Sequence, residues 1–349
     1  MVSNQQSTGR GLMTAAAVAV LFGGVYLASS ILGFVMLAVF FALLCHPIRV
    51  WLMGRGLASS VALTIIAIGL AAIVAGLALL VGVSLGEIVA RLNVYQDQIA
   101  SQSQAFRDRL GKLGLSFADR AAQAALNAEA LGRILAGIIA SIAGFLASSF
   151  YVLLLVIFLL VEGPAMFDRA SRALGSTNPL ITRFRSVSPF IVRYFGLRTY
   201  LNAMTGVGFA LALLALGVDY ALLWGALMFF LSYVPYVGIF VASIPPTILA
   251  LAEHGPGRAI LVVAGITVIN IVLENIIFPR MVGKGLNLPA TVVFLSFFVW
   301  LGLLGAPGAL LSVFLTLLIL LALDSYEHTR WLAKTLIPEP SGEETADKP

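Results

Sequence analysis

The sequence predicts an all-α membrane protein that crosses the bilayer several times. Of its 349 residues, 60% are hydrophobic and 11% are charged, and the mean hydropathy is +1.02. A soluble domain carries about 25% charged residues, and no soluble fold could bury this much apolar surface. The apolar residues also fall into runs of about 20, which is the length that crosses a bilayer as a helix. We therefore expect a polytopic helical bundle with about eight membrane segments.

Three apolar runs define an N-terminal membrane region over residues 1–83. They cover residues 12–29, 30–46 and 59–83. The first two together are too long for the apolar region of a signal peptide, which has about 7–15 residues. We therefore expect two spans joined by a tight turn near Ser29. The single cysteine, Cys45, allows no intramolecular disulfide and is expected to be a small buried residue.

The chain becomes more polar over residues 84–133. Apolar residues there recur every three or four positions, which indicates an amphipathic, coiled-coil-like helix outside the bilayer. They are Leu85, Ile88, Leu92, Tyr95, Ile99, Phe106 and Leu113. An alanine-rich helix over about 116–133 completes the expected helical hairpin. The hairpin is interpreted as having no chemistry of its own, with subunit contact as the alternative.

A second membrane region covers residues 134–325, and a polar tail follows over 326–349. Its uninterrupted runs are 134–161, 199–217 and 259–278. We expect the first of these to end at Pro164, where an arginine-rich segment begins. Two further apolar blocks, 220–252 and 290–323, are interrupted by proline and glycine.

The distribution of Lys and Arg predicts that both termini lie in the cytoplasm. On that orientation the inside segments 1–11, 47–58, 162–198, 279–289 and the tail carry 1, 2, 6, 2 and 3 basic residues. The short outside loops carry Arg258 alone. This is the asymmetry that the positive-inside rule describes. The 84–133 hairpin is nearly charge-balanced and is expected outside.

No enzymatic motif is apparent in the sequence. It contains no phosphate-binding P-loop and no H-E-x-x-H pair, and its three histidines, His46, His254 and His328, are isolated from one another. We therefore expect no enzyme activity, no cofactor and no metal site. The net charge of +5 follows from short basic loops and does not indicate a nucleic-acid partner. The expected partner is the lipid bilayer.

Glu274 is the most convincing acidic residue inside a predicted span. Asn270 precedes it by four residues, so the two share a helix face, and Asn275 follows it. Such acids usually face a bundle interior or a wet cavity. One interpretation is a ligand for a proton, a cation or a polar solute. The other is a structural acid that pairs with Arg280 or a neighbouring helix.

A polar stripe opens the span at 199–217. Arg198, Asn202 and Thr205 lie at positions i, i+4 and i+7 of an otherwise apolar helix. The stripe could face a polar site. Alternatively, Arg198 extends to the lipid headgroups and the other two pack in the ordinary way.

The two interrupted blocks are the third candidate. Their breaking residues are Pro235, Gly238, Pro245 and Pro246 in the first block, and Gly305, Pro307 and Gly308 in the second. Non-helical backbone inside a membrane is tolerated only where protein buries it or it lines a cavity. Broken helices form the substrate site of many secondary transporters. Two ordinary helical hairpins with tight turns would show the same pattern.

The order of several short motifs resembles the autoinducer-2 exporter family of bacterial permeases. These are VPYVG at 234–238, A-x-I-P at 242–245, L-E-N-x-x-x-P at 273–279, NLP at 287–289 and G-x-x-G-x-P-G-A at 302–309. The layout of the first half is also similar, so the resemblance covers about residues 10–325. Ile239 stands where many members have proline, and 311–315 lacks a proline that relatives often have.

The resemblance implies a multi-pass inner-membrane transporter that assembles as a homo-oligomer. Some members are associated with export of the quorum-sensing signal autoinducer-2, and others with cation/proton antiport. We expect a secondary exporter of a small polar solute in which both breaks meet at one site, with Glu274 and Asn275 lining it and Arg198 and Asn202 facing it. Burial would favour the protonated form of Glu274, which makes it the candidate for proton coupling. A Na⁺/H⁺ antiporter and a non-transporting scaffold are the alternatives.

Overall fold

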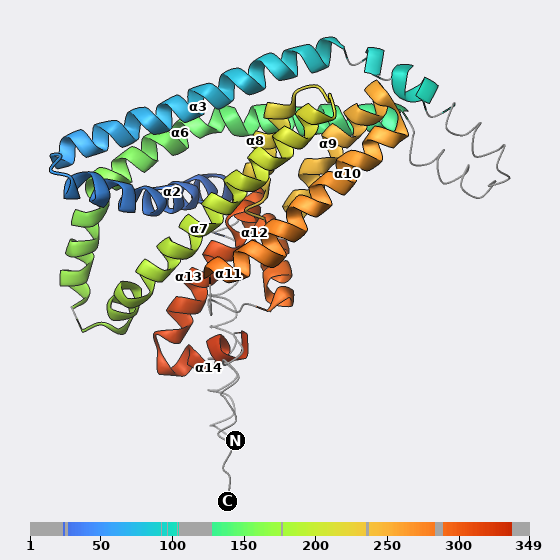
Figure 1. Cartoon of the computed structure of the whole chain (residues 1–349). Helices are drawn as coiled ribbons and strands as arrows, with labels where there is room; N and C mark the ends of the chain where they lie inside the picture. The colour runs from blue at the N-terminus through green and yellow to red at the C-terminus, as the bar shows by residue number, and fades with distance from the viewer. Residues whose placement is uncertain are drawn as a thin grey trace, which may run out of the picture.

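The fold is an assembly of long apolar helices, seen here in a computed structural model (Figure 1). The structure describes residues 24, 27–91, 93–95, 97–102, 104, 128–175, 177–234, 237–282 and 289–336. Within these residues every element is helical, and 7 helices are long and apolar enough to cross a membrane. They are Ile31–Gly54, Ser59–Ala90, Ser148–Leu174, Pro179–Ala215, Val237–His254, Pro256–Met281 and Thr291–Leu310. The predicted polytopic helical bundle is therefore confirmed.

Three long helices form the N-terminal part of the bundle. They are α2 (Ser29–Gly54), α3 (Ser59–Ala90) and α6 (Ala128–Leu174), and each packs against the other two. Figure 1 shows α3 and α6 running side by side. The expected span 12–29 lies almost entirely outside the described residues. Cys45 is buried in α2, as its apolar surroundings predict.

One predicted helix end is wrong. The helix expected to stop at Pro164 continues to Leu174 as part of α6. A proline inside a helix removes one hydrogen bond and favours a bend without requiring that the helix end. Figure 1 shows α6 changing direction before it ends. The basic segment therefore includes the last turns of α6 and the first turns of the next helix.

Four consecutive helices pack in sequence order in the central part of the chain. They are α7 (Pro179–Ala215), α8 (Ala221–Leu231), α9 (Val237–His254) and α10 (Pro256–Asn270), with α10 returning to contact α7. Local signals set their ends. The Asn178 side chain accepts a hydrogen bond from the Leu180 N–H at 3.0 Å and caps α7. Gly255, with φ of 81°, makes the turn before Pro256 at the start of α10.

A second correction concerns Pro245 and Pro246. They were predicted to belong to the first helix break, but α9 is helical throughout from Val237 to His254 and contains both. Both prolines are buried. Each proline removes one backbone donor, which a helix packed among other helices can tolerate. The first break is therefore confined to the segment between Leu231 and Val237.

The C-terminal part begins with a rare helical form. α10 continues into a π-helix (Ile271–Ile277) and then α11 (Phe278–Val282). After the next described residue, Pro289, come α12 (Ala290–Leu310), α13 (Ser312–Asp324) and α14 (Glu327–Leu336). α12 packs on α2 and α13, and α13 also contacts α7.

The helical extension of α3 packs against the ends of the central helices. Leu85, Ile88, Tyr95 and Ile99, four of the residues that predicted an amphipathic helix, are buried in one core cluster with α8, α9 and α10. The rest of the predicted hairpin, 105–127, lies outside the described residues. Burial raises the pKa of the Tyr95 phenol above its ordinary value.

Candidate transport site

The first helix break separates α8 from α9. α8 ends at Leu231 and α9 begins at Val237, while Pro235 lies outside the described residues. Gly238 lies directly against the end of α8, because a Cβ atom added to it would overlap the backbone carbonyl oxygen of Leu231. The glycine of the VPYVG motif thus allows the chain to pass close to its own preceding helix.

The second break lies inside α12. Gly305 has φ of 66° and ψ of −148°, which interrupts the helix at the position that the sequence predicts. Gly308 comes so close to the preceding turns that an added Cβ would overlap the carbonyl oxygen of Trp300. Pro307 follows the break and packs close to Gly33 of α2. The second break is therefore held by close backbone contacts.

Residues from both breaks line a single cavity of about 730 Å³. Val234, Val237 and Gly238 come from the first break, and Ala306, Ala309 and Leu310 from the second. The remaining walls are supplied by α2, α3, α6 and α8. A volume of this size is within the usual range for small-molecule sites, about 300–1,000 Å³.

The cavity wall is mainly apolar. Among the described lining residues, the polar side chains are those of Arg133, Ser141 and Ser149, all on α6. Asp and Glu do not occur in this described lining. Arg133 is the one formally charged residue in this described lining.

A charged pair lies beside the first break and connects three helices. Arg198 of α7 donates from Nη1 to Oε2 of Glu274, in the π-helix, at 2.7 Å. Its Nη2 donates to the carbonyl oxygen of Ser232, just past the end of α8, at 2.6 Å. The ring of Phe278 lies 5.4 Å from the guanidinium carbon. With 7% of its surface exposed, Arg198 does not reach the headgroups, contrary to the snorkelling interpretation.

Further hydrogen bonds join α7 to the first break. The Tyr233 hydroxyl donates to Oγ1 of Thr199 at 2.6 Å. The Asn202 side chain is fully buried, and the amide orientation that satisfies its neighbours accepts from the Tyr233 N–H and donates to the Arg198 carbonyl, both at 3.3 Å. The Tyr233 ring contacts Phe40 of α2 edge-on, with centroids 5.8 Å apart. We call Arg198, Thr199, Asn202, Tyr233 and Glu274 the polar latch.

The structure brings some of the predicted site residues together and separates others. Arg198, Asn202 and Glu274 meet in the polar latch, whereas Asn270 is half-buried and Asn275 is exposed. None of these five lines the described wall of the cavity. The charged pair is connected to the first break through the Ser232 carbonyl, whereas other residues of that break line the cavity. The π-helix contributes to this arrangement, because its wider turns change the directions of Glu274 and Asn275 relative to a regular helix.

The sequence interpretation missed Thr199, Ser232 and Tyr233. Their signal was their position, since Thr199 follows Arg198 and the other two immediately precede the VPYVG motif. Backbone groups near a broken helix need partners inside a membrane, and neighbouring polar side chains are their natural source. The apolar wall on α3 and α6 had no distinguishing signal, because lipid-facing and cavity-facing residues are both apolar.

Comparison with known proteins decides the family. A family model described as AI-2E family transporter matches residues 16–328. The chain belongs to the AI-2E transporter family. Within this AI-2E family, AI-2 transport protein TqsA of Escherichia coli (strain K12) is 32% identical over 305 residues, covering 86% of this chain and 88% of TqsA. The protein YhhT of the same strain is 30% identical over 305 residues, covering 87% of both chains. The resemblance seen in the sequence is thereby confirmed, and the chain is a multi-pass membrane protein of a transporter family.

Proposed function

We propose that this AI-2E transporter is a secondary exporter of a small, uncharged polar solute through the cavity at the two helix breaks, in a bacterial inner membrane. The observation that supports this best is that described residues of both breaks line the same cavity. Broken helices at one central cavity are the usual architecture of a secondary-transport site. Autoinducer-2 is the first candidate solute, because it appears in the name of the relative TqsA.

The lining favours an uncharged solute over a cation. A cation in this cavity would meet a mainly apolar wall and no described carboxylate. Burying an unpaired charge is costly, whereas a small neutral polyol needs only a few hydroxyl or amide partners. Weak binding also suits transport, since a solute must leave the site as well as enter it. The Na⁺/H⁺ antiporter is therefore the second candidate.

The polar latch provides a route for proton coupling. Protonation of Glu274 would remove the negative charge that holds Arg198, and Arg198 also binds the Ser232 carbonyl beside the first break. Val234 and Val237, on the two sides of the first break, line the cavity. A proton on Glu274 would thus loosen one wall of the solute site, which is how a driving ion can alternate access in a secondary transporter.

The solute path is tested by filling the cavity. Ala306→Phe adds a ring to the cavity wall, and Ala264→Phe makes the same change on an exposed face of α10 that does not line the cavity. In proteoliposomes with autoinducer-2 inside, we expect A306F to reduce efflux about tenfold or more and A264F to behave as wild type. Equal efflux by A306F and wild type would place the path elsewhere.

The coupling step is tested separately with Glu274→Gln, which keeps the side-chain shape and removes the charge. We expect E274Q efflux to lose its dependence on pH. If E274Q leaves both the rate and the pH dependence of efflux unchanged, Glu274 is structural.

The alternative functions have their own tests. Dye quenching of an imposed pH gradient on adding Na⁺ identifies the antiporter. Absence of flux for every solute, together with capture of a partner by the 84–133 hairpin, would support the scaffold.

A further inference from the structure

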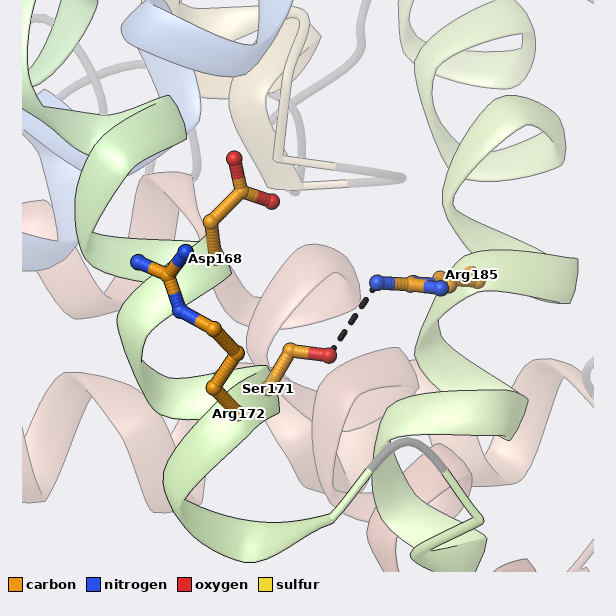
Figure 2. A pocket seen from close by; sticks show the side chains of 4 residues that line it. All are labelled: Asp168, Ser171, Arg172 and Arg185. Carbon is orange, nitrogen blue, oxygen red and sulfur yellow. Dashed lines mark hydrogen bonds between the residues drawn. The ribbon is translucent and has the colours of Figure 1, made fainter.

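A second pocket lies far along the chain from the helix breaks, where α6 ends and α7 begins. It has a volume of about 410 Å³ and is lined by Asp168, Ser171, Arg172 and Arg185. Figure 2 shows the Arg185 side chain extending from one helix toward the three residues on the other. The pocket lies in the arginine-rich segment that the charge distribution assigns to the cytoplasmic side. It is therefore located where two membrane-spanning helices reach the membrane surface.

The arginines of this pocket have guanidinium donors that no described residue uses. Arg183 pairs with Asp324, and Nε of Arg169 donates to the Ala165 carbonyl at 3.2 Å. In contrast, Arg172 has no hydrogen-bond or ion-pair partner among the described residues. Arg185 donates from Nη2 to Oγ of Ser171 at 3.1 Å, which leaves its other nitrogens available. Two guanidinium groups from different helices thus line one pocket, and both have N–H donors available for a ligand.

Ser171 supplies a further donor. Serine hydroxyls in helices usually donate to the carbonyl four residues back, as Ser141 and Ser148 do on the same helix at 2.8 and 3.1 Å. Ser171 makes no such bond within the described chain and accepts from Arg185 instead. Only 4% of Ser171 is exposed, so its hydroxyl proton can reach few groups other than a pocket ligand.

The Asp168 carboxylate adds a negative charge to the pocket, which limits the ligands that fit. It lies one helical turn before Arg172 and has no cationic partner within the described residues. Arginine forks recognise phosphate, and basic pockets between membrane helices bind phosphate headgroups on the cytoplasmic side. A simple phosphate would meet repulsion from the Asp168 carboxylate. A ligand that carries an ammonium group beside its phosphate would satisfy all four side chains.

We propose that this pocket binds the phosphoethanolamine headgroup of a membrane lipid. Arg172, Arg185 and the Ser171 hydroxyl bind the phosphate oxygens, and Asp168 pairs with the ammonium group. The Phe167 ring, 5.7 Å from the Arg185 guanidinium carbon, supports the orientation of that side chain. The position of the pocket at the ends of two spans favours a lipid over a soluble phosphoethanolamine. The proposal is independent of which solute the protein transports.

Retention of lipid by the purified full-length protein tests the assignment. Protein in detergent is exchanged into micelles that contain phosphatidylethanolamine or phosphatidylglycerol, and bound lipid is counted by native mass spectrometry. We expect wild type to retain more phosphatidylethanolamine. Because a charge-assisted hydrogen bond contributes about tenfold in affinity, R172Q and R185Q should each reduce that retention roughly tenfold. The matched control R169Q, on the same helix but outside the pocket, should retain it as wild type does.

Asp168→Asn separates this headgroup from other phosphates. D168N should lose phosphatidylethanolamine while retaining phosphatidylglycerol equally well or better, and an unfolded variant could not produce such opposite changes. Equal retention of both lipids by wild type, or normal retention by R172Q and R185Q, would overturn the proposal. Competition by soluble glycerophosphoethanolamine at the same concentration as the lipid would overturn the assignment to a membrane lipid.

Discussion

The two helix breaks line the same cavity but are held in place by different interactions. The first, between α8 and α9, is connected to α7 by the polar latch, in which Arg198 binds both Glu274 and the Ser232 carbonyl. The second, inside α12, depends on the conformation of Gly305 and on the close approach of Gly308 to the Trp300 carbonyl. Charges can be neutralised by a proton, whereas a steric contact cannot. On the proposed coupling mechanism, the first break would respond to pH and the second would serve as a fixed wall.

The largest effect is expected from removing the cation of the polar latch. Arg198→Met leaves Glu274 without its counter-ion and the Ser232 carbonyl without a donor. Breaking a buried pair costs about 3–5 kcal/mol, and because 28% of the Glu274 side chain is exposed we expect a loss near the lower limit, about 3 kcal/mol. Denaturant unfolding of the detergent-solubilised protein measures it.

The double variant R198M/E274Q is the control for this first prediction. Removing the orphaned charge should recover part of the lost stability, because the remaining amide is cheaper to bury than a carboxylate. If E274Q has the same effect in both backgrounds, the two side chains do not interact, and the first break is held by contacts other than the ion pair.

The sequence predicted the type of most helices and the position of the second break. Hydropathy and length were sufficient for the spans, and Gly305 lies where the glycine-rich motif indicated. The helix ends and breaks predicted at Pro164, Pro245 and Pro246 were wrong. The rule that proline ends a helix describes an isolated helix, whereas a helix packed among others can tolerate one missing backbone donor. The partner of Glu274 was not predictable, since Arg198 is 76 positions away and no local pattern links them.

An intermediate effect is expected from filling the close contact in the second break. Gly308→Ala places a Cβ against the backbone carbonyl of Trp300 and 2.7 Å from Cβ of Leu304. Backbone atoms cannot move aside as a side chain does, so we expect a loss of about 2 kcal/mol. The matched control is Gly302→Ala on the same helix, where an added Cβ meets nothing within 4 Å. G302A should be neutral or stabilising by about 0.5–1 kcal/mol in the same unfolding measurement. Similar stability of G308A and G302A would show that the second break is not rigid.

The smallest effect on stability should come from a pair of variants that each remove one hydrogen bond. Tyr233→Phe deletes the bond to Thr199 at the first break, and Trp300→Phe deletes the bond from Nε1 to Oγ1 of Thr316 at 3.0 Å, near the second. Each loss is expected to cost about 1 kcal/mol, so unfolding alone would not distinguish the two variants.

Their transport behaviour should differ. Y233F loosens the polar latch and should shift the pH dependence of efflux, whereas W300F alters only a neutral contact and should keep the wild-type profile. Efflux from proteoliposomes measured across pH 5–9 makes the comparison. Equal shifts in both variants would mean that the response to pH follows general stability. A shift in Y233F alone would locate the pH response of efflux at the first break. The two variants lose similar amounts of stability, but only the bond lost in Y233F lies next to the Arg198–Glu274 pair.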